Sequence, residues 1–213
     1  MFAAPPEQAL EWSDEGVQGS SRFLKRFWSA VHKHVDNGIG ADVDVSALNE
    51  PQKDLRRKTH ETIRKISDDI GRRNMFNTAV AASMELLNAI NRFEDDSELG
   101  RAVEREALEA VVLMLSPIVP HICHTLWTHL GHASALIDQS WPAVDESALE
   151  RDLVEIVVQV NGKLRGKISV AADADKASII EQALADPNAQ RFIDGGEVRK
   201  TIVVPGRLVN IVV

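Results

Sequence analysis

The sequence predicts two domains: an α-helical bundle, followed by a small α+β domain with the element order β-β-α-β-β. Apolar residues recur with a helical period in the first part of the chain, and short valine- and isoleucine-rich runs bounded by glycine follow. Charge divides at the same place, since residues 1–150 hold 24 acidic and 15 basic side chains and residues 151–213 hold 8 and 9. We therefore expect a bundle over 1–144, a linker over 145–152 and an α+β domain over 153–213.

The overall composition is typical of a folded, water-soluble chain. Apolar residues make up 44% and charged residues 26% of the 213 residues. The formal net charge of -8 argues against a globally basic, nonspecific nucleic-acid-binding protein. No apolar run approaches the roughly 18 residues of a membrane span, and the N-terminus lacks the features of a signal peptide. The single cysteine excludes an internal disulfide, so we expect a cytoplasmic protein.

The first predicted helix has an apolar side and a basic side. Ser20 or Ser21 can cap a helix that runs to about Asp36. Its apolar residues fall within about 140° of the helical wheel: Phe23, Leu24, Phe27, Trp28, Val31 and Val35. The opposite side carries Arg22, Lys25, Arg26 and Lys33. A solvated face accounts for these cations without a function, and a stripe that faces phosphate groups is the functional alternative.

The second predicted helix starts near Pro51. Some of its cations have no acidic partner at i,i+4 in the same helix. Four acid-to-base pairs at i,i+4 support the helix: Asp54–Lys58, Glu61–Lys65, Asp68–Arg72 and Asp69–Arg73. The remaining cations fall within about 100° of the wheel: Lys53, Arg56, Arg57 and Arg64. They predict an anion-facing stripe on an acidic domain.

Three further helices complete the predicted bundle. Apolar periodicity favours helices over about 74–93 and about 98–115. Pro117 and Pro120 end the second of these and restart a fifth helix, because proline fits a first turn but not a helix interior. Residues 131–152 are expected to form a loop and then the linker. Five helices with short connections form a bundle.

The predicted α+β domain opens with a hairpin. Two strand-like runs, 153–160 and 164–170, flank Asn161-Gly162. A two-residue turn would mix valines and cations on one face, so we predict a three-residue loop that begins at Val160 and has Gly162 left-handed. This register places three cations together on the outer face: Lys163, Arg165 and Lys167.

The rest of this domain is predicted as a helix and two strands. The helix covers about 175–194 and is interrupted near Pro187, and strands over 198–204 and 208–213 flank the Pro205-Gly206 turn. A sheet with a helix on one face fits α+β packing. Three more cations lie here: Arg199, Lys200 and Arg207. Solubility alone accounts for them equally well.

No complete catalytic site is visible in the sequence. It contains no Walker A loop, dinucleotide-binding glycine motif, GxSxG elbow or HExxH motif. One segment holds several potential zinc ligands: His121, Cys123, His124, His129 and His132. Their spacing is poor for zinc, so we predict no metal site, and we interpret the histidines as partly buried bundle residues and the cysteine as a core residue.

Five segments carry a family resemblance: WSDEGVQGSSRFLKRFW (12–28), DDIGRRNMFNTAVAASMELLN (68–88), LSPIVPHICHTLW (115–127), VQVNGKLRGKI (158–168) and RKTIVVPGRLVNIVV (199–213). In this order they resemble the C-terminal part of the bacterial leucyl-tRNA synthetase family. The FNTA and PHxxxxLW elements are shared with the valyl and isoleucyl relatives. The closing segments are more specific, because those relatives typically end in a coiled coil or often in a zinc-binding segment.

The resemblance implies a class I leucine–tRNA ligase, which joins leucine to its tRNA with ATP. No HIGH-like or KMSKS-like signature is present, so we expect a fragment that lacks the catalytic and editing domains and is inactive alone. ATP and Mg²⁺ would belong to the catalytic domain, and no cofactor is expected here. The expected partners are leucine-accepting tRNA and that catalytic domain of the same chain. We expect a monomer that does not bind membranes.

The resemblance also implies where tRNA binds. In the family the bundle packs along the inside of the L-shaped tRNA, and the C-terminal domain reaches the outer corner where the D and T loops meet. Candidate corner contacts, by match to the family's segments, are Lys163, Arg165, Lys167, Arg199, Lys200 and Arg207. Candidate backbone contacts of the bundle, chosen from the helical wheels, are Arg22, Lys25, Arg26, Arg56, Arg57 and Arg64.

Two alternative interpretations remain open. The acidic bundle and the absent active site also suit a noncatalytic protein-interaction module. The shared bundle motifs leave the equivalent region of a valyl or isoleucyl relative as the other alternative.

Overall fold

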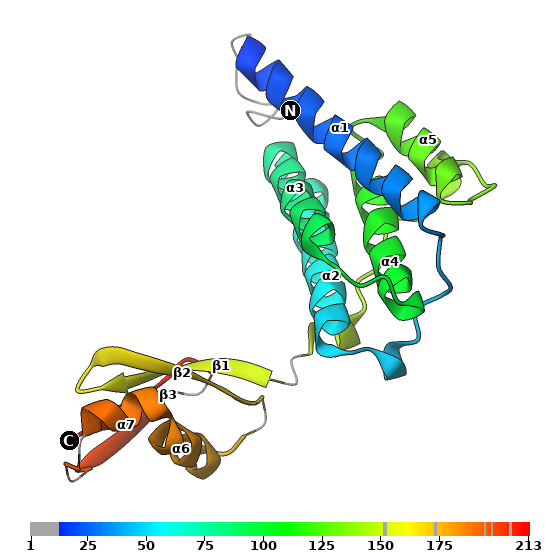
Figure 1. The fold of residues 1–213 in the computed structure, drawn as a ribbon. Coiled ribbons are helices and arrows are strands. Elements are labelled where there is room, and N and C mark those ends of the chain that lie inside the picture. The colour runs from blue at the N-terminus through cyan, green and yellow to red at the C-terminus, as the bar shows by residue number, and fades with distance from the viewer. Residues whose placement is uncertain (1–12, 151–152, 173, 194, 197, 205) are drawn as a thin grey trace. The chain divides into compact units, whose positions relative to one another are not determined.

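The chain folds as a helical unit followed by a small unit of sheet and helices (Figure 1). The computed structural model describes residues 13–150, 153–172, 174–193, 195–196, 198–204 and 206–213. The first unit covers Met1–Leu149 and the second covers Glu150–Val213. The predicted fold class is confirmed. None of the described helices is both long and apolar enough to cross a membrane.

Five α-helices lie in the described residues 13–149 of the first unit, which we call the bundle. They are α1 Asp14–Asp36, α2 Glu50–Gly71, α3 Phe76–Arg92, α4 Glu98–Leu115 and α5 Pro120–His129. Three single-turn helices lie in its connections: η1 Val45–Ala47, η2 Leu136–Asp138 and η3 Glu146–Leu149. The predicted fourth helix and the restart at Pro120 are confirmed.

Helix α1 begins earlier than the sequence predicts. Ser13 is its N-cap and accepts a hydrogen bond from the Gly16 amide at 3.2 Å. Asp14 and Glu15 lie in the first turn, where the helix dipole favours negative charge. Ser20 and Ser21, the two predicted caps, lie inside the helix, and Ser20 donates its hydroxyl to the Gly16 carbonyl. The prediction of a start at Ser20 or Ser21 was therefore wrong, because it overlooked a better cap followed by acids.

Helix α2 begins with a capping box that also joins it to α4. The Asn49 side chain accepts from the Gln52 amide, and the Gln52 side chain accepts from the Asn49 amide. Gln52 also donates to Asp95 and to Ser97, and Ser97 is the N-cap of α4. The starts of α2 and α4 are therefore held together by one buried amide.

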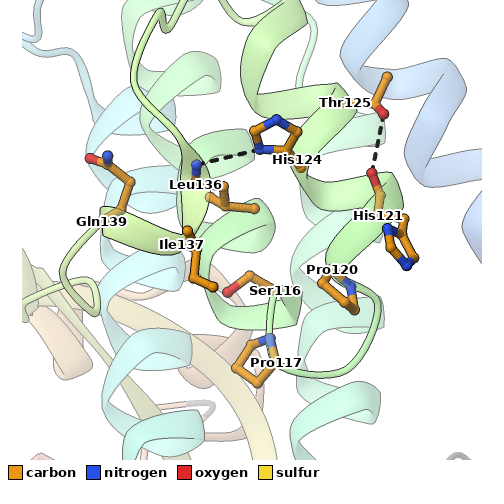
Figure 2. Close-up of a pocket in the computed structure, with 9 residues that line it drawn as sticks. All are labelled: Ser116, Pro117, Pro120, His121, His124, Thr125, Leu136, Ile137 and Gln139. Atoms are coloured by element: carbon orange, nitrogen blue, oxygen red, sulfur yellow. Dashed lines mark hydrogen bonds between the residues drawn. The ribbon is translucent and has the colours of Figure 1, made fainter.

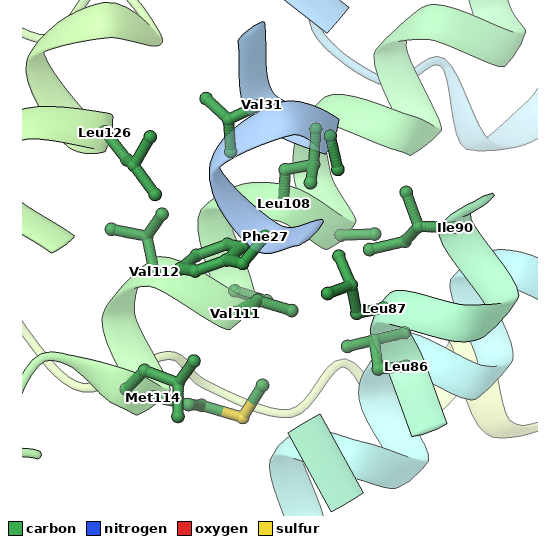
Figure 3. Close-up of a cluster of buried hydrophobic side chains, with 14 of the residues drawn as sticks. Phe27, Val31, Leu86, Leu87, Ile90, Leu108, Val111, Val112, Met114 and Leu126 are labelled. Carbon is green, nitrogen blue, oxygen red and sulfur yellow. The ribbon is translucent and has the colours of Figure 1, made fainter. Parts of the chain in front are cut away.

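Apolar side chains from the helices meet in one core (Figure 3). Phe27 of α1 is fully buried there, between Leu87 of α3 and Val111 and Val112 of α4. Cys123 of α5 is fully buried in the same cluster. Removal of a buried phenylalanine side chain typically costs about 3–5 kcal/mol, so this contact determines where α1 lies on the bundle.

The segment after α5 returns along α2. The Trp141 indole donates to the Ser67 hydroxyl at 2.7 Å, and the Asp145 amide donates to His60 Nδ1 at 3.1 Å. Residues 145–149 are therefore part of the bundle surface, although the sequence predicts a linker over 145–152. Residues 151–152 lie outside the described residues.

The second unit, which we call the small unit, is a four-stranded sheet with two helices. Its elements are β1 Leu153–Val160, β2 Lys163–Ala171, α6 Lys176–Ala185, α7 Pro187–Ile193, β3 Lys200–Val204 and β4 Leu208–Val212. The strand order is β2-β1-β4-β3, in which β1 and β4 are parallel and both hairpins are antiparallel. The helices pack on the sheet, and the predicted break at Pro187 is confirmed.

The β1–β2 turn differs from the predicted three-residue loop. Asn161 and Gly162 both have positive φ, at 50° and 75°, as a two-residue type I′ turn requires. Val160 therefore pairs with Lys163, the register that the sequence analysis rejected.

A bulge reconciles this turn with the apolar pattern. The register shifts between Val158 and Gln159, so that Val158 pairs with Gly166 and Arg165 is the extra residue of β2. Beyond it, Ile156 pairs with Ile168 on the buried face. The prediction failed because it assumed an unbroken register, whereas the bulge restores the alternation without changing the turn.

The turn type can be tested at Gly162. We expect Gly162→Ala to destabilise the small unit by about 1 kcal/mol, because an L-residue is strained at this φ of +75° although the surrounding space is open. Amide hydrogen exchange of β1 and β2 measures the change. Gly71→Ala, at the open end of α2, is the control and should not destabilise the bundle. Unchanged exchange in Gly162→Ala would contradict the left-handed turn.

Candidate nucleic-acid interface

Arg56 is a buried residue of the bundle. Its side chain is 7% exposed. Its Nε donates to Glu106 of α4 at 3.0 Å, and its Nη2 donates to Asp145 at 2.7 Å. The structure thus contradicts the exposed position that the helical wheel predicts for Arg56. The wheel considers α2 alone, whereas these acids come from α4 and from the segment after α5.

The electrostatics of this cluster favour the charged forms. Burial opposes ionisation of Glu106, but the hydrogen bond from His60 and the charge of Arg56 hold the pKa of this carboxyl below its ordinary value. The hydrogen bonds from Arg56 and from Ser147 hold the pKa of Asp145 well below its ordinary value. Arg56, Glu106 and Asp145 therefore form an ionised cluster that joins three segments of the bundle.

The other predicted cations of α2 also have acidic partners. Arg57 donates to Asp54 at 2.5 Å, and Arg64 donates to Glu146. The prediction of an unpartnered cationic stripe on α2 was therefore wrong. Asp54 precedes Arg57 by three residues and Glu146 is distant in the sequence, so the count of i,i+4 acid-to-base pairs missed both.

The cations of α1 are free of acids. Arg22, Lys25 and Arg26 are exposed, and no described carboxylate lies within ion-pair distance of them. Arg26 Nη1 donates to the side-chain oxygen of Asn88 in α3 at 3.1 Å. The predicted basic side of α1 therefore exists, and it extends toward α3.

A hollow of about 490 Å³ lies between α1 and α3, and we call it the α1–α3 groove. Its lining is Lys25, Arg26, Ser29, Ala30, Lys33, Asn88, Asn91 and Arg92. Four of these residues are basic and none is acidic. The sequence analysis missed the α3 side of the groove. An "N-x-x-N-R" pattern on one helix is a weak signal, and only the packing of α1 against α3 gives it significance.

The hairpin cations of the small unit do not share one face. Lys167 pairs with Val157 on the face away from the buried residues, where its Nζ lies 2.7 Å from Glu155. Arg165, at the bulge, instead stacks on Phe192 of α7, with its guanidinium carbon 3.6 Å from the ring centroid. The predicted common face for Lys163, Arg165 and Lys167 was therefore wrong, because it depended on the wrong register.

Lys163 and two further cations lie at one end of the sheet, on its two outer strands. Lys163 begins β2, and Lys200 begins β3 directly after Arg199; all three are exposed. The strand order and registers put both starts at the end that holds the Asn161-Gly162 turn. Arg207 follows β3 at the opposite end of its hairpin. We call Lys163, Arg199 and Lys200 the sheet-end cluster.

A second hollow in the bundle, of about 670 Å³, has different chemistry (Figure 2). It lies between the start of α5 and η2, and its lining contains no lysine, arginine, aspartate or glutamate. His121 and His124 line it, and His124 Nδ1 accepts from the Leu136 amide at 3.4 Å. Its apolar and neutral lining is unsuited to binding phosphate.

Three of the four histidines that the sequence analysis singled out differ from the prediction of partly buried residues. His121, His124 and His129 are exposed, whereas His132 is half-buried beside Glu109. Two histidines that the sequence analysis did not single out, His34 and His60, are buried and contact acids of α4. In the part of the chain that the structure describes, no three His, Cys, Asp or Glu side chains could hold a metal ion together.

Cys123 has the environment of a core residue. Burial raises the pKa of its thiol to about 12, so the thiolate that a nucleophile needs is disfavoured.

The comparisons with known proteins assign the class of this fold. The family model of the anticodon-binding domain of tRNA ligases matches residues 52–181. The chain therefore belongs to the family of anticodon-binding domains of tRNA ligases.

Within this class, the similar proteins include leucine–tRNA ligases. The whole chain is 64% identical to a leucine–tRNA ligase of Thioalkalivibrio sulfidiphilus and 63% identical to one of Chromohalobacter salexigens. It spans only 26% and 25% of these relatives' lengths. The predicted resemblance to bacterial leucyl-tRNA synthetases is confirmed.

A solved structure has the same fold. It is a LeuRS of Agrobacterium radiobacter K84 in a ternary complex with tRNA and LeuAMS. The TM-score is 0.79 and the sequence identity 24%, over 99% of this chain and 27% of that chain.

The structural role of Arg56 can be tested by Arg56→Met, which removes the charge and keeps most of the apolar stem. We expect a loss of about 3 kcal/mol in the free energy of unfolding, because the half-buried Glu106 and Asp145 both lose their cation. Urea unfolding followed by tryptophan fluorescence measures it. Arg72→Met, which breaks an exposed i,i+4 pair with Asp68, is the matched control and should cost less than about 1 kcal/mol.

The same cluster predicts a pH dependence. The pKa values of Glu106 and Asp145 are lower in the folded state than in the unfolded chain. The stability they add is therefore present above about pH 4 and is lost as the pH falls through their folded pKa values. We expect Arg56→Met to lose less stability than the native chain between pH 6 and pH 3, by the same measurement. An equal loss in both proteins would contradict this role of Arg56.

Proposed function

We propose that this chain is a tRNA-binding portion of a leucine–tRNA ligase, a class I enzyme that joins leucine to its tRNA with ATP. The observation that carries the proposal is the acid-free groove of cations on an otherwise acidic bundle of the anticodon-binding family. Lysine and arginine contacts to phosphates position a folded RNA and give salt-dependent affinity. The identity of 64% to a leucine–tRNA ligase supports leucine as the amino acid.

The bundle would contact the tRNA through α1. Its exposed cations Arg22, Lys25 and Arg26 have no described acid within ion-pair distance, so tRNA binding breaks no ion pair there. Arg56 is withdrawn from the proposed contacts because it is buried. Arg57 and Arg64 would first have to exchange Asp54 and Glu146 for phosphate, which makes them weaker candidates.

The small unit would contact the outer corner of the tRNA. The sheet-end cluster presents three exposed cations at one end of the sheet, on its two outer strands, and Arg207 is exposed at the other end of the β3–β4 hairpin. Arg165 and Phe192 form a cation–π pair, a flat surface on which an unpaired base can stack. Lys167 would have to leave Glu155 to take part.

The remaining parts of the proposal concern the whole protein. Leucine activation, editing, ATP and Mg²⁺ would belong to the other domains of the ligase, and the catalytic domain would be the second partner of this chain. The ligase would be a monomer in the cytoplasm. We expect no leucine-dependent pyrophosphate exchange by this chain alone.

Fluorescence anisotropy of the chain with leucine- and valine-accepting tRNA, each at low and moderate salt, tests tRNA binding. We expect salt-sensitive binding that is tighter for the leucine acceptor. A preference for the valine acceptor would indicate the valyl relative. A monomer without affinity for either tRNA would overturn a tRNA-binding role for the isolated chain.

A charge-reversed variant of the sheet-end cluster tests whether this cluster contacts tRNA. We expect Lys163→Glu with Lys200→Glu to weaken tRNA binding and to lower the salt dependence of the affinity by about 2 units of slope, since each phosphate contact contributes about one. Lys176→Glu is the control, because Lys176 is exposed in the first turn of α6, where a glutamate suits the helix dipole. An unchanged slope would remove the cluster from the interface.

The alternative of a protein-interaction module has one observation in its favour. Ile137, at the rim of the hollow beside α5, is 91% exposed. Light scattering tests this alternative: a stable complex with a second copy would support it, and a monomer that binds tRNA would argue against it.

A further inference from the structure

We propose that the α1–α3 groove holds consecutive phosphate groups of one RNA strand, so that α1 and α3 clamp the tRNA backbone together. This inference rests on the proposed tRNA-binding function and goes beyond it. It assigns a binding role to Lys33, Asn88, Asn91 and Arg92, and it predicts backbone binding without selection of bases.

The α1–α3 groove carries positive charge on an acidic bundle. The bundle half of the chain is acidic, with 24 acidic and 15 basic side chains in residues 1–150. Cations there tend to be paired, as Arg56 and Arg64 are. Lys25, Lys33 and Arg92 have no ion-pair partner among the described residues, and the groove lining contains no acid. Three unpaired cations of the bundle therefore lie where the surface is hollowed.

The two helices line the groove with two facing rows of side chains. Lys25, Ser29 and Lys33 follow one another at i, i+4 and i+8, so they form one row along α1. At a rise of about 1.5 Å per residue this row is about 12 Å long. Asn88, Asn91 and Arg92 form the facing row on α3. Such a length suits an extended chain of charges better than one small anion.

A hydrogen bond between Arg26 and Asn88 joins the two rows. Arg26 Nη1 donates to Asn88 Oδ1 at 3.1 Å, which orients the guanidinium between α1 and α3. This bond uses one acceptor site of the Asn88 side-chain oxygen, and both N–H groups of its amide stay available as donors. Arg26 keeps its other N–H groups. The bond therefore holds the Arg26 guanidinium and the Asn88 amide side by side, with N–H groups of both available to a ligand.

The donor inventory identifies the ligand. Lysine and arginine side chains only donate, so the ligand must offer several acceptors and negative charge. Phosphodiester oxygens of RNA meet both requirements, and they repeat along the strand as the cations repeat along α1. The acceptors of the lining are the side-chain oxygens of Ser29, Asn88 and Asn91 beside four cations, so it suits phosphates better than the Watson–Crick edges of bases, which need acceptors as well as donors. We therefore expect groove contacts to contribute equally to all tRNAs.

Arg92→Glu tests the groove. Arg92 is exposed in the last turn of α3, so the substitution leaves the core intact. We expect the affinity for leucine- and valine-accepting tRNA to fall alike, about tenfold at low salt, with a salt slope lower by about one. Lys176→Glu, with the same charge change in α6, is the control and should bind as the native chain does. Thermal unfolding checks that both variants are folded.

A second measurement does not require tRNA. We expect single-stranded oligouridylate to shift the NMR signals of the Asn88 and Asn91 side-chain amides in the native chain, and to shift them several-fold less in Arg92→Glu. Suppose that the native chain binds tRNA, that Arg92→Glu binds it with the same affinity and that the two amide signals do not shift. This result would overturn the proposed role of the groove and leave the proposed function standing. Amide shifts with oligouridylate but no tRNA binding would overturn the proposed function alone. Shifts produced only by an acidic peptide would overturn RNA as the ligand.

Discussion

The fold and the interface of this chain both depend on where its charges are paired. Arg56 lies inside the bundle, and its ion pairs with Glu106 and Asp145 tie α2 to α4 and to the segment after α5. A charge of this kind is tolerated only with partners, since an isolated buried ion is very unfavourable. The same cluster therefore stabilises the bundle and removes its most central cation from any contact with a ligand.

Charge pairing then determines which cations remain available for the proposed contacts with RNA. In a unit with an excess of acids, a basic side chain near a carboxylate forms an ion pair, and its affinity for phosphate falls accordingly. Arg57 and Arg64 belong to this group. The basic face of α1 does not, because its neighbours on α3 are asparagines and Arg92. An acidic net charge and a cationic groove are thus compatible in one domain.

In the small unit, a shift of one residue in the β1–β2 register changes the face of the sheet on which the cations lie. The Asn161-Gly162 turn requires two residues in the left-handed region, and the bulge at Arg165 restores the apolar alternation behind it. Arg165 consequently stacks on Phe192 and does not join Lys167. The strand order and registers place Lys163 and Lys200, at the starts of β2 and β3, at the same end of the sheet and on its two outer edges.

The sequence by itself determined the two-part architecture, the helix breaks at Pro117 and Pro187 and the family, because periodicity, proline geometry and motifs are local properties of the chain. The tertiary structure alone decided which cations are available. Arg56 meets acids from elements about 50 and 89 residues away, and the α1–α3 groove exists only where two distant helices pack. No helical wheel contains such neighbours, since it describes one element without its surroundings.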